Sequence, residues 1–283
     1  MELTRRLARF GLALLAFASN TLLLSSTLRA SGPTVEQYGG REMLVYVPAS
    51  LRSRATAALV VVLHGGLGNA ERIESGGSER GLNLDTVAEH DGFFVAYLNG
   101  TPVTRFSTRM LGWNAGGGCC GQAALNNVDD VGYITKAIDY LAGKYPIDRG
   151  RVYGIGHSNG AMMTARMICE TTLYAAAVTV SGPLNLDVAA CPSARGRRIL
   201  AIHGADDENV PVAGGRGSRG LSRATYSSES HARQVFMNSG ASYELDVVPG
   251  ADHALTHIDD AIRRREGTSL AQKSARFFGL STP

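Results

Sequence analysis

The sequence predicts an α/β fold with a mostly parallel central sheet and helices on both of its faces. Runs of β-branched and leucine residues recur along the chain, and helical stretches lie between them. This alternation is typical of parallel sheets, because parallel neighbours need a crossover connection that is usually a helix. The chain has 283 residues, 44% of them apolar, which is enough for one sizeable core.

The predicted strands differ in how they are buried. Residues 41–48 alternate and then stop at Pro48, as a solvent-facing edge strand would. Residues 57–66 are nearly continuous in apolar side chains before His-Gly-Gly, which is typical of a strand buried on both faces. Five more buried runs are predicted strands: FFVAYLNG from Phe93, RVYGIG from Arg151, AAAVTVSG from Ala175, RRILAIHG from Arg197 and YELDVV from Tyr243.

Two helices follow from the residue pattern. One opens near Asp129 and Asp130, where the positive end of a helix favours acids, and another starts just after Ser158. The first carries an apolar stripe of Val131, Ile134, Ile138 and Leu141. The glycine-rich segments 116–121 and 214–220 are expected to be loops. Without a repeat or a composition break, residues 31–283 are predicted to form a single catalytic domain.

The first 30 residues are predicted to be an export signal. Arginines precede an apolar stretch, and small residues follow it up to Ala30. Because Ser19 and Asn20 interrupt the apolar stretch, it is shorter than the roughly 20 residues of a membrane span. We therefore expect a secreted or periplasmic protein with no stable membrane span after signal removal. An uncleaved membrane anchor remains the alternative.

Four cysteines follow the leader: Cys119, Cys120, Cys169 and Cys191. An even number in an oxidising compartment favours disulfides, and the C-x-x-C pair that zinc would want is absent. We expect a bond between Cys169 and Cys191, although this leaves the neighbouring pair only each other. The net charge of +3 is too small, and the basic residues are too scattered, for a nucleic-acid partner. We expect a monomer.

The motif Gly156-His157-Ser158-Asn159-Gly160 carries the functional prediction. G-x-S-x-G alone is weak evidence in a chain with 34 glycines. Here a buried strand leads into the motif and a helix follows, which is the arrangement that exposes a nucleophilic serine. The Asn159 N–H, at the helix N-terminus, is then expected to stabilise an oxyanion. The alternative is that Ser158 is only a small polar residue in a tight turn.

Candidates for the acid and the base follow the serine in the order found in α/β-hydrolases. Asp206 and Asp207 lie in the loop after one predicted strand, and His253 lies in the loop after the next. These loops leave the carboxyl ends of the strands, where open α/β sheets bind their ligands. His257, four residues beyond His253, is the alternative base.

The second oxyanion donor is expected from the loop after the early buried strand. Within LHGG the Gly66 N–H is the first candidate, and Leu67 is the next. His64 and His203 each precede a glycine at a strand end, and we expect both to shape loops rather than to transfer protons.

These residues resemble the exported α/β-hydrolase esterases that include polyhydroxybutyrate depolymerase catalytic domains and feruloyl or acetylxylan esterases. The resemblance runs from about Glu42 to His253, and it rests on VVLHGG, GWN followed by GGGCCG, VDDVGY, YPIDRGRVYGIGHSNGAMM and HGADDENVP. It implies an α/β-hydrolase fold. In the family's H-G-x-x-D-x-x-V-P motif the triad acid matches Asp207 rather than Asp206, its histidine matches His253, and its second oxyanion donor matches Gly66.

The resemblance departs from the family at the expected substrate platform. The family often has an aromatic residue soon after the catalytic histidine, but this chain reads HALTH. Trp113, the one tryptophan, is therefore the candidate aromatic contact, with a buried core role as the alternative. His157 is the other candidate contact, although it points away from the site if Ser158 points into it.

Taken together, these residues predict a serine carboxylic-ester hydrolase. His253 would take the Ser158 proton, Asp207 would orient the imidazole, and water would release the acyl-enzyme. This chemistry requires no metal or organic cofactor. The expected substrates are polyhydroxyalkanoate-type oligomers or feruloyl and acetyl esters. The alternatives are a peptidase or amide hydrolase with the same triad, and an exported non-catalytic binding protein of hydrolase fold.

Overall fold

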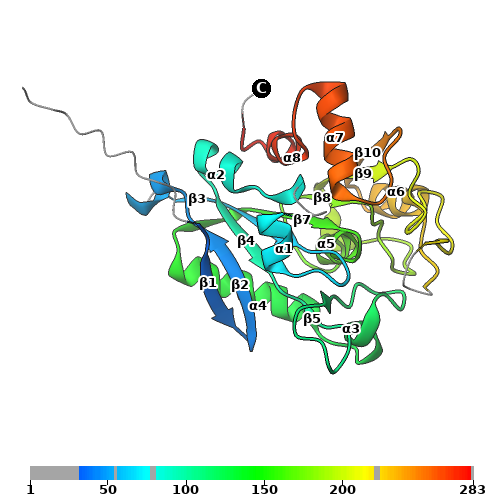
Figure 1. Cartoon of the computed structure of the whole chain (residues 1–283), viewed down its shortest axis with the longest axis horizontal. Helices are drawn as coiled ribbons and strands as arrows, with labels where there is room; N and C mark the ends of the chain where they lie inside the picture. The colour runs from blue at the N-terminus through cyan, green and yellow to red at the C-terminus, as the bar shows by residue number, and fades with distance from the viewer. Residues whose placement is uncertain (1–31, 54–55, 77–80, 220–223, 282–283) are drawn as a thin grey trace, which may run out of the picture.

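The computed structural model describes residues 32–53, 56–76, 81–219 and 224–281, and the predicted export signal lies outside these ranges. In the described part of the chain an eight-stranded sheet runs through the middle of the molecule (Figure 1). Its strands lie in the order β1 (Thr34–Tyr38), β2 (Arg41–Tyr46), β4 (Phe94–Leu98), β3 (Ala57–Leu63), β7 (Ile147–His157), β8 (Ala176–Val180), β9 (Arg198–Gly204) and β10 (Ser242–Val248).

The strands from β4 to β10 in this order are parallel, and each of them corresponds to a predicted strand. The predicted burial of β10 is wrong, because β10 lies at the edge of the sheet and only Tyr243 and Val248 of it are buried. β2 is antiparallel to both β1 and β4. The prediction of an edge strand at residues 41–48 is therefore wrong, because β1 covers that edge. Pro48, which has no backbone N–H, removes no hydrogen bond between β2 and β4, because the last residue of β2 that pairs with β4 is Tyr46.

β3 shows why a continuous apolar run predicts a central strand. Leu59, Val61 and Leu63 face one core cluster, whereas Val60 and Val62 face the other. All five side chains are fully buried. Successive residues of a strand point to opposite faces, so a strand between two helical layers needs apolar residues at every position.

Helices cover both faces of the sheet (Figure 1), which confirms the predicted fold class. Side chains of three helices join the core cluster of one face: α4 (Asp130–Lys144), α5 (Asn159–Glu170) and α6 (Glu229–Asn238). The other face is covered by α1 (Ala70–Ser75), α2 (Asp85–Asp91), α7 (Leu255–Glu266) and α8 (Leu270–Phe278).

α4 begins where its sequence predicts. The Asp129 side chain accepts a hydrogen bond from the Gly132 N–H and so caps the first turn. Asp130 is buried and forms an ion pair with Arg41 of β2 at 2.7 Å. The predicted apolar stripe faces the core, with Ile134, Ile138 and Leu141 buried.

Short elements shape the carboxyl edge of the sheet. After β4, a small ribbon of β5 (Thr101–Pro102) and β6 (Leu111–Gly112) leads into the predicted loop at 116–121 and then into α3 (Gly121–Leu125). Two 3-10 turns, η1 (Ala49–Ser53) and η3 (Pro192–Ala194), complete the connections. None of the described helices is long and apolar enough to cross a membrane.

Two disulfides join the four cysteines. The expected bond between Cys169, in the last turn of α5, and Cys191, in the loop after β8, is present. Cys119 is bonded to its neighbour Cys120. The Cys169–Cys191 bond ties α5, the helix that follows Ser158, to the loop after β8.

We expect the paired substitution Cys169→Ala and Cys191→Ala to lower the free energy of unfolding by about 3 kcal/mol, because it frees a long loop of the unfolded chain. The bond spans 22 positions of the sequence. Urea denaturation of the oxidised protein and of the paired variant measures the difference. Cys119→Ala with Cys120→Ala is the matched control, since a bond between neighbours closes no long loop. Equal midpoints for wild type and the first variant would contradict the prediction.

Candidate active site

Ser158 is the single residue between the end of β7 and the start of α5. Its φ of 53° lies in the left-handed region, which non-glycine residues adopt rarely and usually for a functional reason. Its N–H donates to the Val180 carbonyl of β8 at 2.8 Å. The turn is therefore fixed to the sheet, and the side chain projects from the carboxyl edge.

Both glycines of the motif are required by close backbone contacts. A Cβ on Gly156 would overlap the carbonyl of Gly160, and a Cβ on Gly160 would overlap the carbonyl of Leu63 in β3. The first turn of α5 thus packs directly against the ends of two strands. This is the strand, turn and helix arrangement that the motif predicts.

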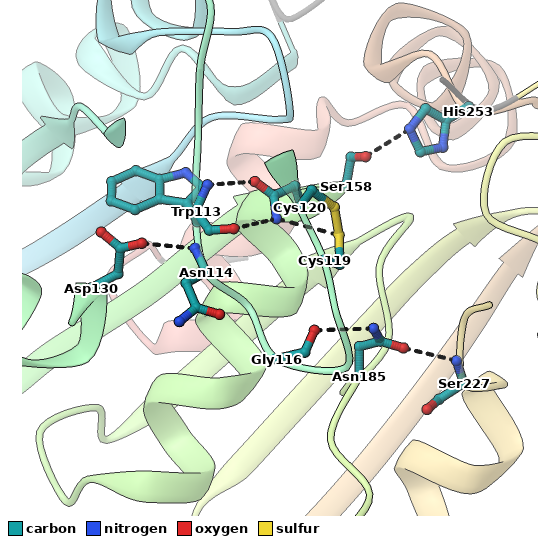
Figure 2. The surroundings of a disulfide bond; sticks show 11 residues. Trp113, Asn114, Gly116, Cys119, Cys120, Asp130, Ser158, Asn185, Ser227 and His253 are labelled. Atoms are coloured by element: carbon teal, nitrogen blue, oxygen red, sulfur yellow. Dashed lines mark hydrogen bonds between the residues drawn. A yellow bond between two sulfur atoms is a disulfide. The ribbon is translucent and has the colours of Figure 1, made fainter. Parts of the chain in front are cut away.

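The structure brings Ser158, His253 and Asp207 together in one hydrogen-bonded chain. The Ser158 hydroxyl donates to Nε2 of His253 over 2.9 Å, and Nδ1–H of His253 donates to Oδ2 of Asp207 over 2.7 Å. Figure 2 shows the Ser158 side chain directed at the His253 ring. These distances are within the range expected for a nucleophile, its base and an orienting acid.

The loops that carry His253 and Asp207 are held against each other at the ends of β9 and β10. The last residue of β9 is Gly204, and a Cβ there would overlap the carbonyl of Asp252. The Asp206 N–H donates to the Ala251 carbonyl at 3.0 Å. This packing leaves Asp207 buried and in contact with His253.

The buried carboxylate of Asp207 is surrounded by donors. Its Oδ1 accepts from the N–H groups of Asn209 and Val210, both at 2.8 Å. Burial alone would raise the pKa of Asp207, but hydrogen bonds from His203 and His253 outweigh burial and hold that pKa well below its usual range. Asp207 is therefore a permanent anion beside His253. His203, which we expected only to shape a loop, is one of its donors.

The other histidines near the site have separate roles. His257 is exposed, and its Nδ1 lies 2.8 Å from Asp252 rather than near Ser158. His157 packs behind His253, with 4.9 Å between ring centroids, and its Nε2 bonds to the His253 carbonyl at 2.9 Å. Burial, together with the neighbouring His253, lowers the pKa of His157 to about 3, so its ring is neutral.

The two candidate oxyanion donors lie side by side. A Cβ on Gly66 would be 3.7 Å from the Cβ of Asn159. Neither backbone N–H has a hydrogen-bond partner among the described residues. Leu67, the next candidate, donates its N–H to the Leu111 carbonyl at 2.8 Å and is therefore occupied.

Trp113 does not reach a cleft, so its candidate role as a substrate contact is corrected. Its side chain is 0% exposed, and the indole N–H donates to the His64 carbonyl at 3.0 Å. The Trp113 backbone instead exchanges two hydrogen bonds with the Asn159 side-chain amide, at 2.7 and 3.0 Å. The backbone of Trp113 thus supports Asn159, whose backbone N–H is a candidate oxyanion donor.

The loop with the neighbouring cysteines packs on the same amide. Nδ2 of Asn159 lies 3.5 Å from the sulfur of Cys119, and the Cys120 N–H donates to the Trp113 carbonyl at 3.0 Å. Figure 2 also shows Asn185 joining this loop to a later one, through the Gly116 carbonyl and the Ser227 N–H. The Asn159 side chain was not among the residues that the sequence pointed to, because its partners lie in another loop.

A cavity of about 590 Å³ lies beside His253. Its walls are mostly polar, and they comprise His157, Asp206, Glu208, Asn209, Arg219, Gly250, Asp252, His253, Ala254 and His257. Arg219 pairs with Glu208 at 2.6 Å, so the acids leave the cavity with a negative balance. In the described part of the chain, no group of three or more His, Cys, Asp or Glu side chains is arranged to hold a metal ion.

The chain matches known proteins in sequence over its middle part. Residues 92–193 match the prolyl oligopeptidase family. The chain is 28% identical over 182 residues to feruloyl esterase B of Piromyces equi, covering 62% of this chain and 31% of that protein. It is 33% identical over 150 residues to the probable acetylxylan esterase A of Aspergillus terreus, covering 50% and 42%. The chain thus matches less than half of the length of these relatives.

A comparison of structures extends the likeness over most of the chain. The acetyl xylan esterase from Aspergillus awamori superposes with a TM-score of 0.54 at 19% identity, covering 88% of this chain and 100% of that one. Identity this low carries information on the fold rather than on the substrate. The chain therefore has the α/β-hydrolase fold and is similar in sequence to feruloyl and acetylxylan esterases.

Proposed function

We propose that the chain is a serine carboxylic-ester hydrolase that works through an acyl-enzyme. The hydrogen-bonded chain from the Ser158 hydroxyl through His253 to the buried Asp207 carboxylate carries this proposal. The positive φ of Ser158 supports it, because strained backbone of this kind is stored at functional sites. The names of the relatives support an ester as the substrate.

In the first half-reaction, Ser158 Oγ attacks the ester carbonyl while Nε2 of His253 takes its proton. Asp207 holds the imidazole in the tautomer that leaves Nε2 free to accept, and its negative charge stabilises the imidazolium that forms. His253 then gives the proton to the leaving alcohol. Water repeats the cycle on the acyl-enzyme and releases the acid together with free Ser158.

The negative oxygen of the tetrahedral intermediate would lie against the N–H groups of Asn159 and Gly66. The first group belongs to the first turn of α5, and the second belongs to the loop that leaves β3. Donors fixed before the reaction stabilise developing charge without reorganisation, and losing one such donor typically costs about 3 kcal/mol.

We place the alcohol part of the ester in the polar cavity beside His253, because this residue must protonate the leaving oxygen. Feruloyl or acetyl esters of polar alcohols suit such walls, and polyhydroxyalkanoate-type oligomers are the second class. We further propose that residues 31–283 act as one monomeric catalytic domain after export. The two disulfides support an oxidising compartment.

A peptidase or amide hydrolase is the second candidate, since residues 92–193 match the prolyl oligopeptidase family. Both reactions need the same nucleophile, base and acid, so substrates must separate them. Peptide p-nitroanilides and p-nitrophenyl esters of matched acyl groups are the direct comparison. Faster turnover of the anilide than of the ester would favour the peptidase.

Ser158→Ala should abolish hydrolysis of p-nitrophenyl acetate and butyrate, with kcat falling by about 10⁴-fold or more, because the acyl-enzyme can no longer form. Steady-state kinetics measure the loss, and circular dichroism should show an unchanged fold. An active wild type that is also labelled at Ser158 by an organophosphonate would separate the enzyme from a non-catalytic binding protein. Equal rates in the two proteins would contradict the proposal.

Asp207→Asn should lower kcat by about 10³-fold to 10⁴-fold, because the amide can hold the imidazole in the wrong tautomer and lacks the charge that stabilises it. The adjacent Asp206→Asn is the matched control, since Asp206 makes no contact with His253 in the described hydrogen bonds. Because Asp206 lines the cavity proposed for the alcohol, the comparison is made on kcat rather than on KM. The kcat of Asp206→Asn should stay within about threefold of wild type. A larger loss in the Asp206 variant would reverse the assignment.

The acidic side of the kcat/KM profile should have a slope of one on logarithmic axes. The base His253 must be neutral to act, so activity rises with pH as one proton leaves it. Asp207 adds no second proton, because its hydrogen bonds hold its pKa well below its usual range. Initial rates in buffers of constant ionic strength test this, and a slope of two would show that the carboxylate titrates as well.

A further inference from the structure

His203 is the last residue but one of β9; it is fully buried and does not line the cavity. Its Nδ1 is 2.7 Å from Oε1 of Glu229, the first residue of α6. Its Nε2 is 2.8 Å from the Val210 carbonyl and 3.2 Å from Oδ2 of Asp207. Asp207 Oδ2 therefore contacts two imidazole rings, one from His253 and one from His203.

Each partner of the His203 ring is a hydrogen-bond acceptor. A neutral imidazole has one N–H and one bare nitrogen, so one nitrogen would face an oxygen without a proton between them. Protonation of both nitrogens satisfies all the contacts. Glu229 is held in this arrangement by a second contact, because its other oxygen accepts from the Tyr243 hydroxyl.

The side chains therefore form a buried chain from α6 to the catalytic serine. Glu229 contacts His203, His203 contacts Asp207, and Asp207 contacts His253. Burial opposes the charge on His203, but hydrogen bonds to Asp207 and Glu229 outweigh it and raise the pKa of His203 to about 9. At neutral pH this histidine carries its proton.

We propose that His203 is a positioning residue that stays protonated, offsets the buried charge of Asp207 and so sets the pH at which His253 becomes an active base. The proposal rests on the proposed hydrolase function. His203 does not touch the reacting atoms, and it acts through Asp207.

The expected direction follows from the charge next to His253. Without the positive ring, Asp207 attracts a proton on His253 more strongly, so the base is neutralised only at higher pH. The other titratable or charged groups beside His253 are not changed by the experiment. They include Ser158, His157 and Asp252, together with Asp206, Glu208, Arg219 and His257 in the cavity walls.

The protonation of His203 is tested first, in ring-¹⁵N-histidine-labelled protein, with His203→Gln to assign its signals. We expect both ring nitrogens to keep imidazolium shifts between about pH 6 and 8. One protonated and one bare nitrogen at neutral pH would overturn the proposal. This NMR measurement does not depend on enzyme activity.

The effect on the base is tested by kcat/KM profiles for p-nitrophenyl acetate. His203→Gln should move the acidic limb up by about one pH unit, whereas Glu229→Gln, which keeps the positive ring and removes a negative charge, should move it down. The double variant should move the limb up by less than His203→Gln does, because it also removes the Glu229 carboxylate. It leaves no unpaired charge at the His203–Glu229 pair if the single variant does not fold. His90→Gln, on the exposed surface of α2, should leave the limb unchanged.

A purely structural role for His203 would lower activity at every pH and leave the limb in place, which would overturn the proposal. If wild type has no esterase activity, the proposed function fails on its own. The His253 ring titration by ¹⁵N shifts then decides the further inference. Its midpoint should rise in the double variant, and an unchanged midpoint would overturn the inference.

Discussion

Backbone contact between the first turn of α5 and the ends of β3 and β7 is the constraint on which the rest of the site depends. Gly160 packs on the Leu63 carbonyl with no room for a Cβ, so the helix lies directly on the sheet. That contact brings the Asn159 N–H beside Gly66 and leaves Ser158 as the one residue that bridges strand and helix. The reactive geometry is thus built from regular elements, and the loop with Trp113 and Cys119 packs around it.

The acid and base loops obey a second constraint, which is electrostatic. A carboxylate taken out of water is costly unless donors replace the water around it. Asp207 has two backbone N–H groups on one oxygen and two histidine rings on the other. The hydrogen bonds that make its burial tolerable are also those that aim His253 at Ser158. Stability and chemistry therefore depend on the same contacts at this point of the fold.

The sequence predicted the parts of the fold that are decided locally. Continuous apolar runs predicted the central strands, and an apolar stripe that follows two acidic residues predicted α4. The G-x-S-x-G motif between a strand and a helix predicted the turn at Ser158. β1 was missed because its five residues, TVEQY, carry no clear pattern and become a strand through pairing with β2. His203 and Glu229 are 26 positions apart in the sequence, so only the fold reveals their contact. The burial of Trp113 likewise depends on packing between distant loops.

The backbone at Ser158 also limits which other nucleophiles this protein could adopt. A left-handed φ of 53° is tolerated by side chains with an unbranched Cβ, whereas a β-branched residue would press its extra methyl group against the neighbouring backbone. Cysteine shares the shape of serine at this position, so a thiol version of the site is one substitution away. A threonine version would require a different turn.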